Sequence, residues 1–302
     1  MAPVDVKQLQ LRDVPVSSPS ITRPFPGFAG STTKISPVCR PSATLAVWSS
    51  AWLNGAAASD DILDALQVWA EAHDFVAADA AAAEAFDLPL AFNRAATPVQ
   101  LLLALRAQGA KSMQLLLPVP GDVRGLGGGG QFTEAALRTG EAVLLPDLGY
   151  GVVPEAIAEG LMRWTVYSVP TPGVLDHRPL GEAEHGLTDA IRSSAGALQT
   201  LDVASERPGV RAELSARLRA ATDAPWPAGM PGRALRVLQR SQEIAAILAI
   251  AESDDPGGAL SASAALRRAE ALRPLTEAVR NARSAAINEA VRVFAEQADR
   301  HP

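Results

Sequence analysis

The sequence contains a single cysteine, Cys39, and only three lysines, Lys7, Lys34 and Lys111, among its 27 basic residues. One cysteine cannot form an intramolecular disulfide, and no Cys/His spacing typical of a zinc site is present, so the hydrophobic core must hold the fold together. Arginine replaces the missing lysine. This bias, together with heavy alanine usage, is typical of GC-rich coding sequences rather than of a particular function.

Long apolar runs and clustered positive charge are also missing. The longest apolar run, residues 244–251, is too short to cross a bilayer, and the N-terminal MAPVDVKQLQLRD lacks the apolar centre of a signal peptide. The formal net charge is −6, whereas binding to a nucleic-acid backbone requires clustered positive charge. We therefore expect a cytoplasmic protein that binds neither membranes nor nucleic acids.

The composition divides the 302 residues into four segments. Residues 1–42 are rich in proline and serine and show no sustained period, so we expect an extended arm. Residues 43–170 combine helix and strand patterns, residues 171–181 form a linker, and residues 182–302 carry helical patterns alone. The sequence thus predicts an α/β N-terminal domain with a small, mostly parallel sheet, followed by an all-α helical C-terminal domain.

Three segments have strand patterns. Residues 113–119 and 142–145 are continuously apolar, which is typical of strands covered on both faces. A helix expected at residues 132–139 and ended by Gly140 would join them as parallel neighbours. Residues 161–169 alternate apolar and polar side chains, which predicts a half-covered or edge strand.

Four segments after the linker have the length of helices: 182–204, 210–222, 233–252 and 261–297, the last with a break or kink expected at Pro274. Apolar side chains cover nearly the whole circumference of the third, so we expect it to be the central buried helix. The fourth carries one apolar stripe and should pack against that centre from outside. The stripe consists of Leu275, Val279, Ala282, Ala286 and Val293.

Four consecutive glycines, Gly127, Gly128, Gly129 and Gly130, lie between the first expected strand and the helix that follows it. A glycine-rich turn in this position lets backbone amides approach a phosphate at the helix N-terminus. However, the Gly-Lys-Ser/Thr ending of a Walker A loop is absent, and a GxGxxG match is unavoidable in so glycine-rich a run. A connecting loop, a partner-contact loop and a phosphate-binding loop are the three interpretations.

The expected strand direction predicts where a ligand site would lie. If the strands at 113–119 and 142–145 are parallel, the loops after them emerge at the same edge of the sheet, where α/β folds bind ligands. Asp122, Arg124, Asp147 and Tyr150 would then converge beside the glycines and form a candidate ligand site. Solvated loop charges are the alternative interpretation.

Other patterns do not identify chemistry. Residues 176–189, DHRPLGEAEHGLTD, concentrate carboxylates and histidines, but their spacing matches no known metal site, and a solvated hinge is the interpretation we prefer. No GxSxG nucleophile elbow is present, and Cys39 has no neighbouring histidine. The sequence therefore indicates no catalytic residue, metal or cofactor.

Two stretches, PVPGDVRGLGGGGQFTEAAL and GMPGRALRVL, together with the alanine- and arginine-rich background, resemble uncharacterised conserved proteins of high-GC actinobacteria. The resemblance covers the chain after residue 43 and implies no activity, catalytic residue or cofactor. We therefore expect a cytosolic, non-enzymatic interaction or regulatory protein with a protein partner or a homo-oligomeric state. The alternative is a binding protein or enzyme that takes a small anionic or phosphorylated ligand at the glycine-rich loop.

Overall fold

The computed structural model of the chain describes residues 40–91, 94–169, 178–200, 209–220, 225–253 and 262–300. Most of the expected N-terminal arm and of the expected linker lies outside these ranges. Within them the chain forms nine helices and a five-stranded sheet. The helices are α1 (Pro41–Leu53), α2 (Ser59–Gln67), α3 (Ala80–Phe86), α4 (Pro98–Ala107), α5 (Gln131–Thr139), α6 (Leu180–Thr200), α7 (Val210–Ala220), α8 (Gly232–Ser253) and α9 (Ala262–Arg300), and the strands are β1 (Ala72–Ala77), β2 (Gln114–Leu116), β3 (Ala142–Leu145), β4 (Tyr150–Ala158) and β5 (Leu161–Ser168).

The sheet has the strand order β1-β5-β4-β3-β2, with β1 parallel to β5 and every other neighbouring pair antiparallel. The prediction of a mostly parallel sheet is therefore wrong, because β2 and β3 pair in opposite directions. The long loop from Leu117 to Gly130 gives the chain room to reverse before α5. The helix is thus not the return crossing that a parallel pair requires.

The sequence prediction missed β4 because this strand contains Gly151 and Pro154, which disfavour strand interiors. Gly151 lets α5 approach the sheet, since a Cβ at this position would collide with Cε2 of Phe132. Pro154 lies past Val152, the last β4 residue that pairs with β3. β4 therefore accommodates both a glycine and a proline, although these residue types disfavour strand interiors.

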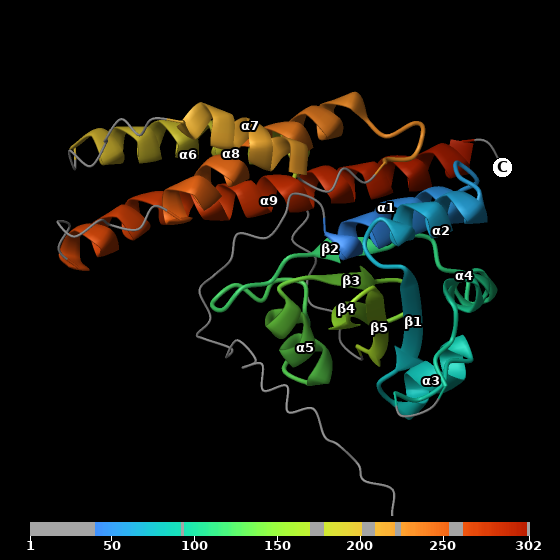
Figure 1. The fold of residues 1–302 in the computed structure, drawn as a ribbon. Helices are drawn as coiled ribbons and strands as arrows, with labels where there is room; N and C mark the ends of the chain where they lie inside the picture. The colour runs from blue at the N-terminus through green and yellow to red at the C-terminus, as the bar shows by residue number, and fades with distance from the viewer. Residues whose placement is uncertain are drawn as a thin grey trace, which may run out of the picture. The chain divides into compact units, whose positions relative to one another are not determined.

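The two faces of the sheet pack against different helices (Figure 1). One face is covered by α5 through a small apolar cluster that includes Phe132, Leu144 and Val153. The other face packs against α1, α3 and α4 and belongs to a larger core. The alternating burial of β5 confirms the prediction of a half-covered strand, although β5 lies between β1 and β4 rather than at an edge.

The helices expected after the linker are present as α6, α7, α8 and α9, with ends that differ from the predicted ones by a few residues where the structure describes them. Pro274 does not break α9, which runs from Ala262 to Arg300. Near the proline, the Ala271 carbonyl accepts a hydrogen bond of 2.9 Å from Ser194 Oγ, which joins α9 to α6. None of the described helices is long and apolar enough to span a bilayer.

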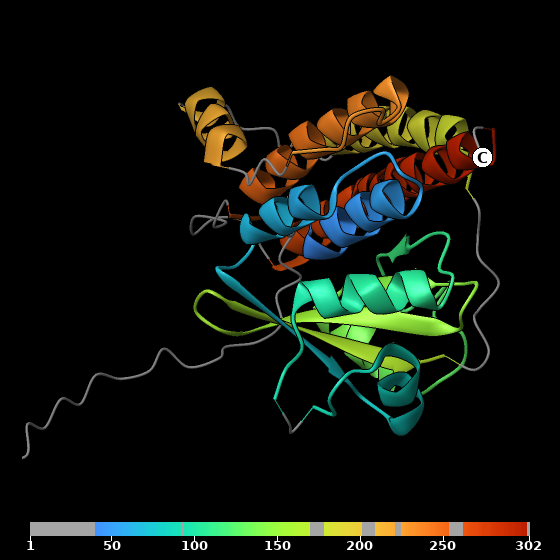
Figure 2. The ribbon, with the colours of Figure 1, turned by 90° about the vertical axis from the view of Figure 1, so that its right-hand side faces the viewer.

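The central helix is α9, and the prediction that the segment 233–252 takes this position is wrong. α9 packs against α6 and α8 on one side and against α1 and β2 on the other (Figures 1 and 2). In α8, which contains the segment 233–252, Leu235 and Ile247 remain 37% and 45% exposed, whereas Ala282, Ala286 and Ala290 of α9 are buried. Small alanine side chains allow helices on both sides to approach α9 closely, an effect that a hydrophobicity pattern does not reveal.

One hydrophobic core joins the two halves of the chain. Residues 35–302 form one compact unit, and the main core takes side chains from α1, the sheet, α8 and α9. The first four residues of the expected α9 stripe belong to this core, whereas Val293 is half-buried and Phe294 takes its place. The helices of the second half therefore complete the core of the sheet-containing half.

Other parts of the chain close both edges of the sheet. At β1, Phe75 and Ala96 donate backbone hydrogen bonds to each other's carbonyl oxygens, each at 2.9 Å. At β2 the partner is α9, because Leu115 N donates to Asn288 Oδ1 at 2.8 Å and Asn288 Nδ2 donates to Leu115 O at 3.1 Å. The carboxamide of Asn288 thus takes the place of the peptide group of a further strand.

Replacing Asn288 with alanine should lower the free energy of unfolding by about 1–3 kcal/mol, because it leaves the N–H and C=O of Leu115 without this partner. Denaturant unfolding followed by circular dichroism measures the change. Asn281→Ala is the matched control on the same helix, since the Asn281 side chain makes no hydrogen bond to the described residues; it should stay within about 0.5 kcal/mol of wild type. Equal losses in both variants would contradict an edge-closing role for Asn288.

Candidate functional site

A groove of about 360 Å³ lies between α9, β2 and the loop that follows β2. Its volume is in the range of small-molecule sites. Its charged side chains are mainly cationic: Arg124, Arg178, Arg280 and Arg292 stand against one carboxylate, Asp122. The uncharged polar side chains in the lining are Ser112, Gln114, Asn281, Ser284 and Asn288.

α9 contributes a polar stripe to this groove. Arg280, Ser284, Asn288 and Arg292 follow one another at intervals of four residues, which places them on one face of the helix. The sequence prediction missed this stripe because it considered the apolar face of the same helix. The repeated spacing R-x3-S-x3-N-x3-R is the signal that identifies it.

A tight turn places Asp122 in the groove. Asp122 N donates to Val119 O at 2.8 Å, and Val119 N donates to Asp122 O at 3.1 Å, across Pro120 and Gly121. Proline followed by a glycine with φ of +89° is the pattern of a type II turn. The Pro-Gly pair thus directs the chain so that the Asp122 carboxylate reaches α9.

The Asp122 carboxylate joins two arginines from distant parts of the chain. Arg124 donates from Nε to Oδ1 and from Nη2 to Oδ2, both at 2.7 Å. Arg280 donates from Nη2 to Oδ2 at 2.6 Å and from Nη1 to the Leu117 carbonyl at 2.9 Å. These bonds, above all those from Arg124, hold the pKa of Asp122 well below its usual range. At neutral pH one carboxylate anion therefore lies between two guanidinium groups.

The other end of the groove is less cationic. Arg292 lies about 18 Å from Arg280 along the helix axis. It donates hydrogen bonds to Glu289 and Glu296, which balance its charge. The strongest attraction for an anion is therefore at the end of the groove formed by Arg124 and Arg280.

The structure brings part of the predicted ligand site together. Asp122 and Arg124 line the groove. Asp147 and Tyr150 lie at the opposite end of the sheet, because β3 runs antiparallel to β2 and ends far from the loop after β2. Asp147 is exposed in the turn before β4, and the Tyr150 ring packs edge-on against Phe86 with 4.9 Å between ring centroids. The predicted convergence of the four residues is wrong.

The glycine run forms the connection into α5. Gly125 lines the groove, but none of Gly127 to Gly130 does. The Gly130 carbonyl accepts a hydrogen bond from the Glu134 backbone amide, and the Gly128 carbonyl accepts one of 2.7 Å from Thr133 Oγ1. The positive charge of the groove therefore comes from arginine side chains, and the amides of this run do not line it.

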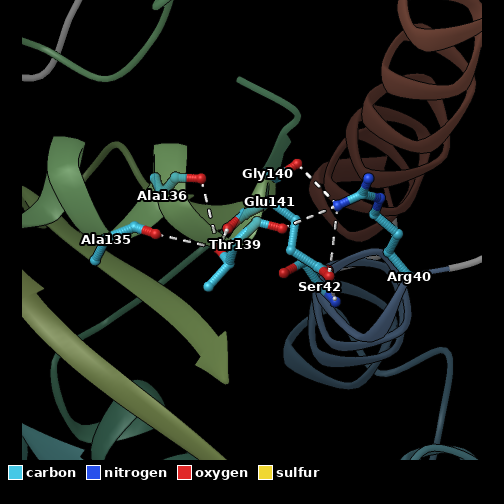
Figure 3. Close-up of polar contacts among 7 residues, drawn as sticks. All are labelled: Arg40, Ser42, Ala135, Ala136, Thr139, Gly140 and Glu141. Carbon is cyan, nitrogen blue, oxygen red and sulfur yellow. Dashed lines mark hydrogen bonds and ion pairs between the residues drawn. The ribbon is translucent and has the colours of Figure 1, made fainter. Parts of the chain in front are cut away.

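A second charged cluster lies where α5 ends and α1 begins (Figure 3). Arg40 Nη1 donates to the carbonyl oxygens of Thr139 and Gly140, at 3.3 and 3.0 Å, at the C-terminus of α5. Ser42 N at the start of α1 donates to Glu141 Oε2 at 2.9 Å. Arg40 Nη1 also lies 3.7 Å from Glu141 Oε1. Each charge thus lies at the helix end whose dipole favours it.

The Arg40–Glu141 pair has a structural role. Burial raises the pKa of Glu141, although Arg40 and the Ser42 amide favour the ionised form. Neither residue lines the 360 Å³ groove. We assign the pair to the junction between α1 and α5.

The acidic and histidine-rich stretch is helical where the structure describes it. Residues 182–189 belong to α6, so the expected hinge is absent there, and residues 176–177 lie outside the described ranges. His185 Nε2 lies 3.1 Å from Asp189 Oδ2 on the exposed surface of this helix. In the described part of the chain, which excludes Cys39, no three His, Cys, Asp or Glu side chains gather as a metal site would require.

Two glycines of the loop after β2 should respond differently to substitution. Gly125→Ala should destabilise the fold by about 1–3 kcal/mol, because Gly125 has φ of +80° and a Cβ there would lie 2.7 Å from Leu116 Cδ2. Gly128→Ala is the matched control, since a Cβ at Gly128 meets no atom within 4 Å. Urea unfolding of both variants measures the difference, and similar stabilities would refute the close approach of Gly125 to β2.

The buried carboxylate predicts a pH dependence. Burial raises the pKa of Glu141 in the folded state above its ordinary value of 4.5. The protonated Glu141 side chain therefore contributes its full stabilisation below about pH 4.5, and this stabilisation is lost as the pH rises through the folded-state pKa. Glu141→Gln does not titrate, so its unfolding free energy minus that of wild type should increase between about pH 4 and pH 7. Urea unfolding at several pH values measures this difference. Thr139→Val is the non-titrating control, and a Glu141→Gln difference as flat as that of the control would exclude the raised pKa.

Comparison with known proteins shows where the chain belongs. Residues 42–180 match the N-terminal domain of the Rv1486c-like protein family, and residues 181–284 match its C-terminal domain. The chain is 41% identical over 275 residues to the uncharacterized protein Rv1486c of Mycobacterium tuberculosis (strain H37Rv) and 36% identical over 286 residues to the uncharacterized protein ML1804 of Mycobacterium leprae. Each match covers 82% of this chain and 96% of the relative. No solved structure gives a significant match. The resemblance to uncharacterised actinobacterial proteins is confirmed, and the chain belongs to the Rv1486c-like family.

Proposed function

We propose that this protein binds a small anionic ligand in the groove between β2 and α9 and acts as a non-enzymatic regulatory protein of the cytoplasm. The observation that carries the proposal is the meeting of Arg124 and Arg280 at one end of the 360 Å³ groove. Guanidinium groups bind carboxylates and phosphates through paired N–H donors. The groove therefore combines the charge and the volume that a small anion requires.

The lining of the groove favours binding over catalysis. Among the described residues that form it, there is no histidine, cysteine or lysine, and Asp122 is the one carboxylate. A general base must be able to take up a proton near neutral pH, whereas the pKa of Asp122 is held far below that range. The lining thus supplies recognition groups without an acid–base pair.

The position of the groove supports a regulatory role. Arg280 contacts both the carbonyl of Leu117 and the carboxylate of Asp122, while α9 itself packs against α6, α8 and α1. A ligand that binds Arg280 therefore contacts the helix on which the packing of the second half depends. We propose that a protein partner or a second copy of the chain recognises the resulting change.

Replacing Arg124 with glutamine should weaken anion binding at least tenfold, which corresponds to about 1.4 kcal/mol, because it removes one of the two guanidinium groups. The measurement is thermal denaturation with phosphate, pyrophosphate, citrate and ribose 5-phosphate, followed by titration calorimetry of any anion that raises the Tm. Arg138→Gln is the matched control, since Arg138 lies on α5 with a side chain that is 59% exposed. If no anion stabilises the wild type, or if both variants respond equally, the proposal fails.

A further inference from the structure

Asp122 occupies the position in the groove that an anion would take. Its carboxylate accepts hydrogen bonds from Arg124 and Arg280 at 2.6–2.7 Å. Building on the proposed function, we propose that the ligand is a phosphorylated sugar or polyol whose phosphate replaces the Asp122 carboxylate between these two arginines. The carboxylate is thus a built-in competitor of the ligand.

The charges at this end of the groove fit a phosphate monoester better than a carboxylate. The two guanidinium groups carry two positive charges, whereas Asp122, the one carboxylate in the lining, carries a single negative charge. A phosphate monoester carries a charge of about −1.5 to −2 at pH 7 and presents three acceptor oxygens. Its charge and its three acceptor oxygens therefore suit a position where two guanidinium groups converge.

The loop that carries Asp122 can move so that the carboxylate leaves the two arginines. Residues 121, 123 and 124 are exposed, and Leu126 is the buried anchor of this part of the loop. Gly121 in the turn and Gly125 just before Leu126 have positive φ, and so do Gly127 and Gly130 after Leu126. Because the turn holding Asp122 contributes few side chains to the core, its movement leaves the core intact. The glycine run then provides the backbone freedom that the movement requires.

The rest of the groove offers uncharged partners for hydroxyl groups. Asn281 follows Arg280 on α9, and Gln114 and Ser112 lie on the side of β2. The structure shows no hydrogen-bond partner for these three side chains among the residues that it describes. Amides and hydroxyls both donate and accept hydrogen bonds, as sugar hydroxyls do. The groove therefore suits a ligand with one phosphate and an uncharged polar body.

The decisive variant is Asp122→Asn, which removes the competing charge and keeps the side-chain shape. Titration calorimetry with inorganic phosphate and with ribose 5-phosphate should show at least tenfold tighter binding of both to Asp122→Asn than to wild type. If Asp122 instead orders the two arginines for the ligand, the variant will bind both probes more weakly, and that result overturns the inference.

A second variant tests the polar body of the ligand. Asn281→Ala should weaken the binding of ribose 5-phosphate several-fold and leave the binding of inorganic phosphate unchanged, whereas ribose alone should not bind measurably. Equal affinities of the wild type for inorganic phosphate and ribose 5-phosphate would exclude the sugar-binding part of the inference.

The outcomes separate this inference from the proposed function. If neither wild type nor Asp122→Asn binds any anion, the proposed function itself fails. If wild type binds phosphate but Asp122→Asn binds it no more tightly, only the replacement of Asp122 is refuted. If Asp122→Asn does not fold, hydrogen exchange of the wild type tests whether the phosphate replaces Asp122. Ribose 5-phosphate should then speed the exchange of the backbone amides of residues 119–130. Slower or unchanged exchange would refute the replacement.

Discussion

The pairing of the Asn288 carboxamide with the Leu115 peptide group is the contact on which the rest of the structure depends. It supplies both hydrogen bonds that a further strand would make at the edge of β2, so the sheet ends there without an open edge. The same contact fixes the long central helix against the sheet and brings Arg280 to the loop after β2. The groove follows from this arrangement, because it is the space beside the line where α9 meets the sheet edge.

Two carboxylates join distant parts of the chain, and their environments give them different roles. Asp122 lies near the surface between two arginines, which lower its pKa and leave it ionised. Glu141 is buried beside one arginine and one helix N-terminus, and burial raises its pKa. Asp122 pairs with Arg124, whose side chain is 46% exposed, and with Arg280, whose side chain is 19% exposed. The Glu141 side chain is 11% exposed and pairs with Arg40 alone, so separating that pair leaves a buried charge without its partner.

Local sequence signals predicted many of the elements correctly. Gly140 ends α5 in the left-handed conformation, as expected. The strand at residues 142–145 also appears as expected. These features depend on residues a few positions apart. The missed strand β4 and the wrong choice of the central helix share another cause: contacts between distant segments decide how a glycine, a proline or an alanine-rich face is used.

The sequence by itself determined the turn that presents Asp122, because a Pro-Gly pair specifies that turn within four residues. It also determined the end of α5 at Gly140 and the alternation along β5. Only the tertiary structure decided that β2 and β3 run antiparallel, and hence that Asp147 and Tyr150 lie far from Asp122. The tertiary structure also decided that Arg280 donates a hydrogen bond to Asp122, which lies 158 residues away along the chain. The physical reason is that a helix stripe of arginine, serine and asparagine looks like a solvated face until an edge strand and a carboxylate are there to accept its hydrogen bonds.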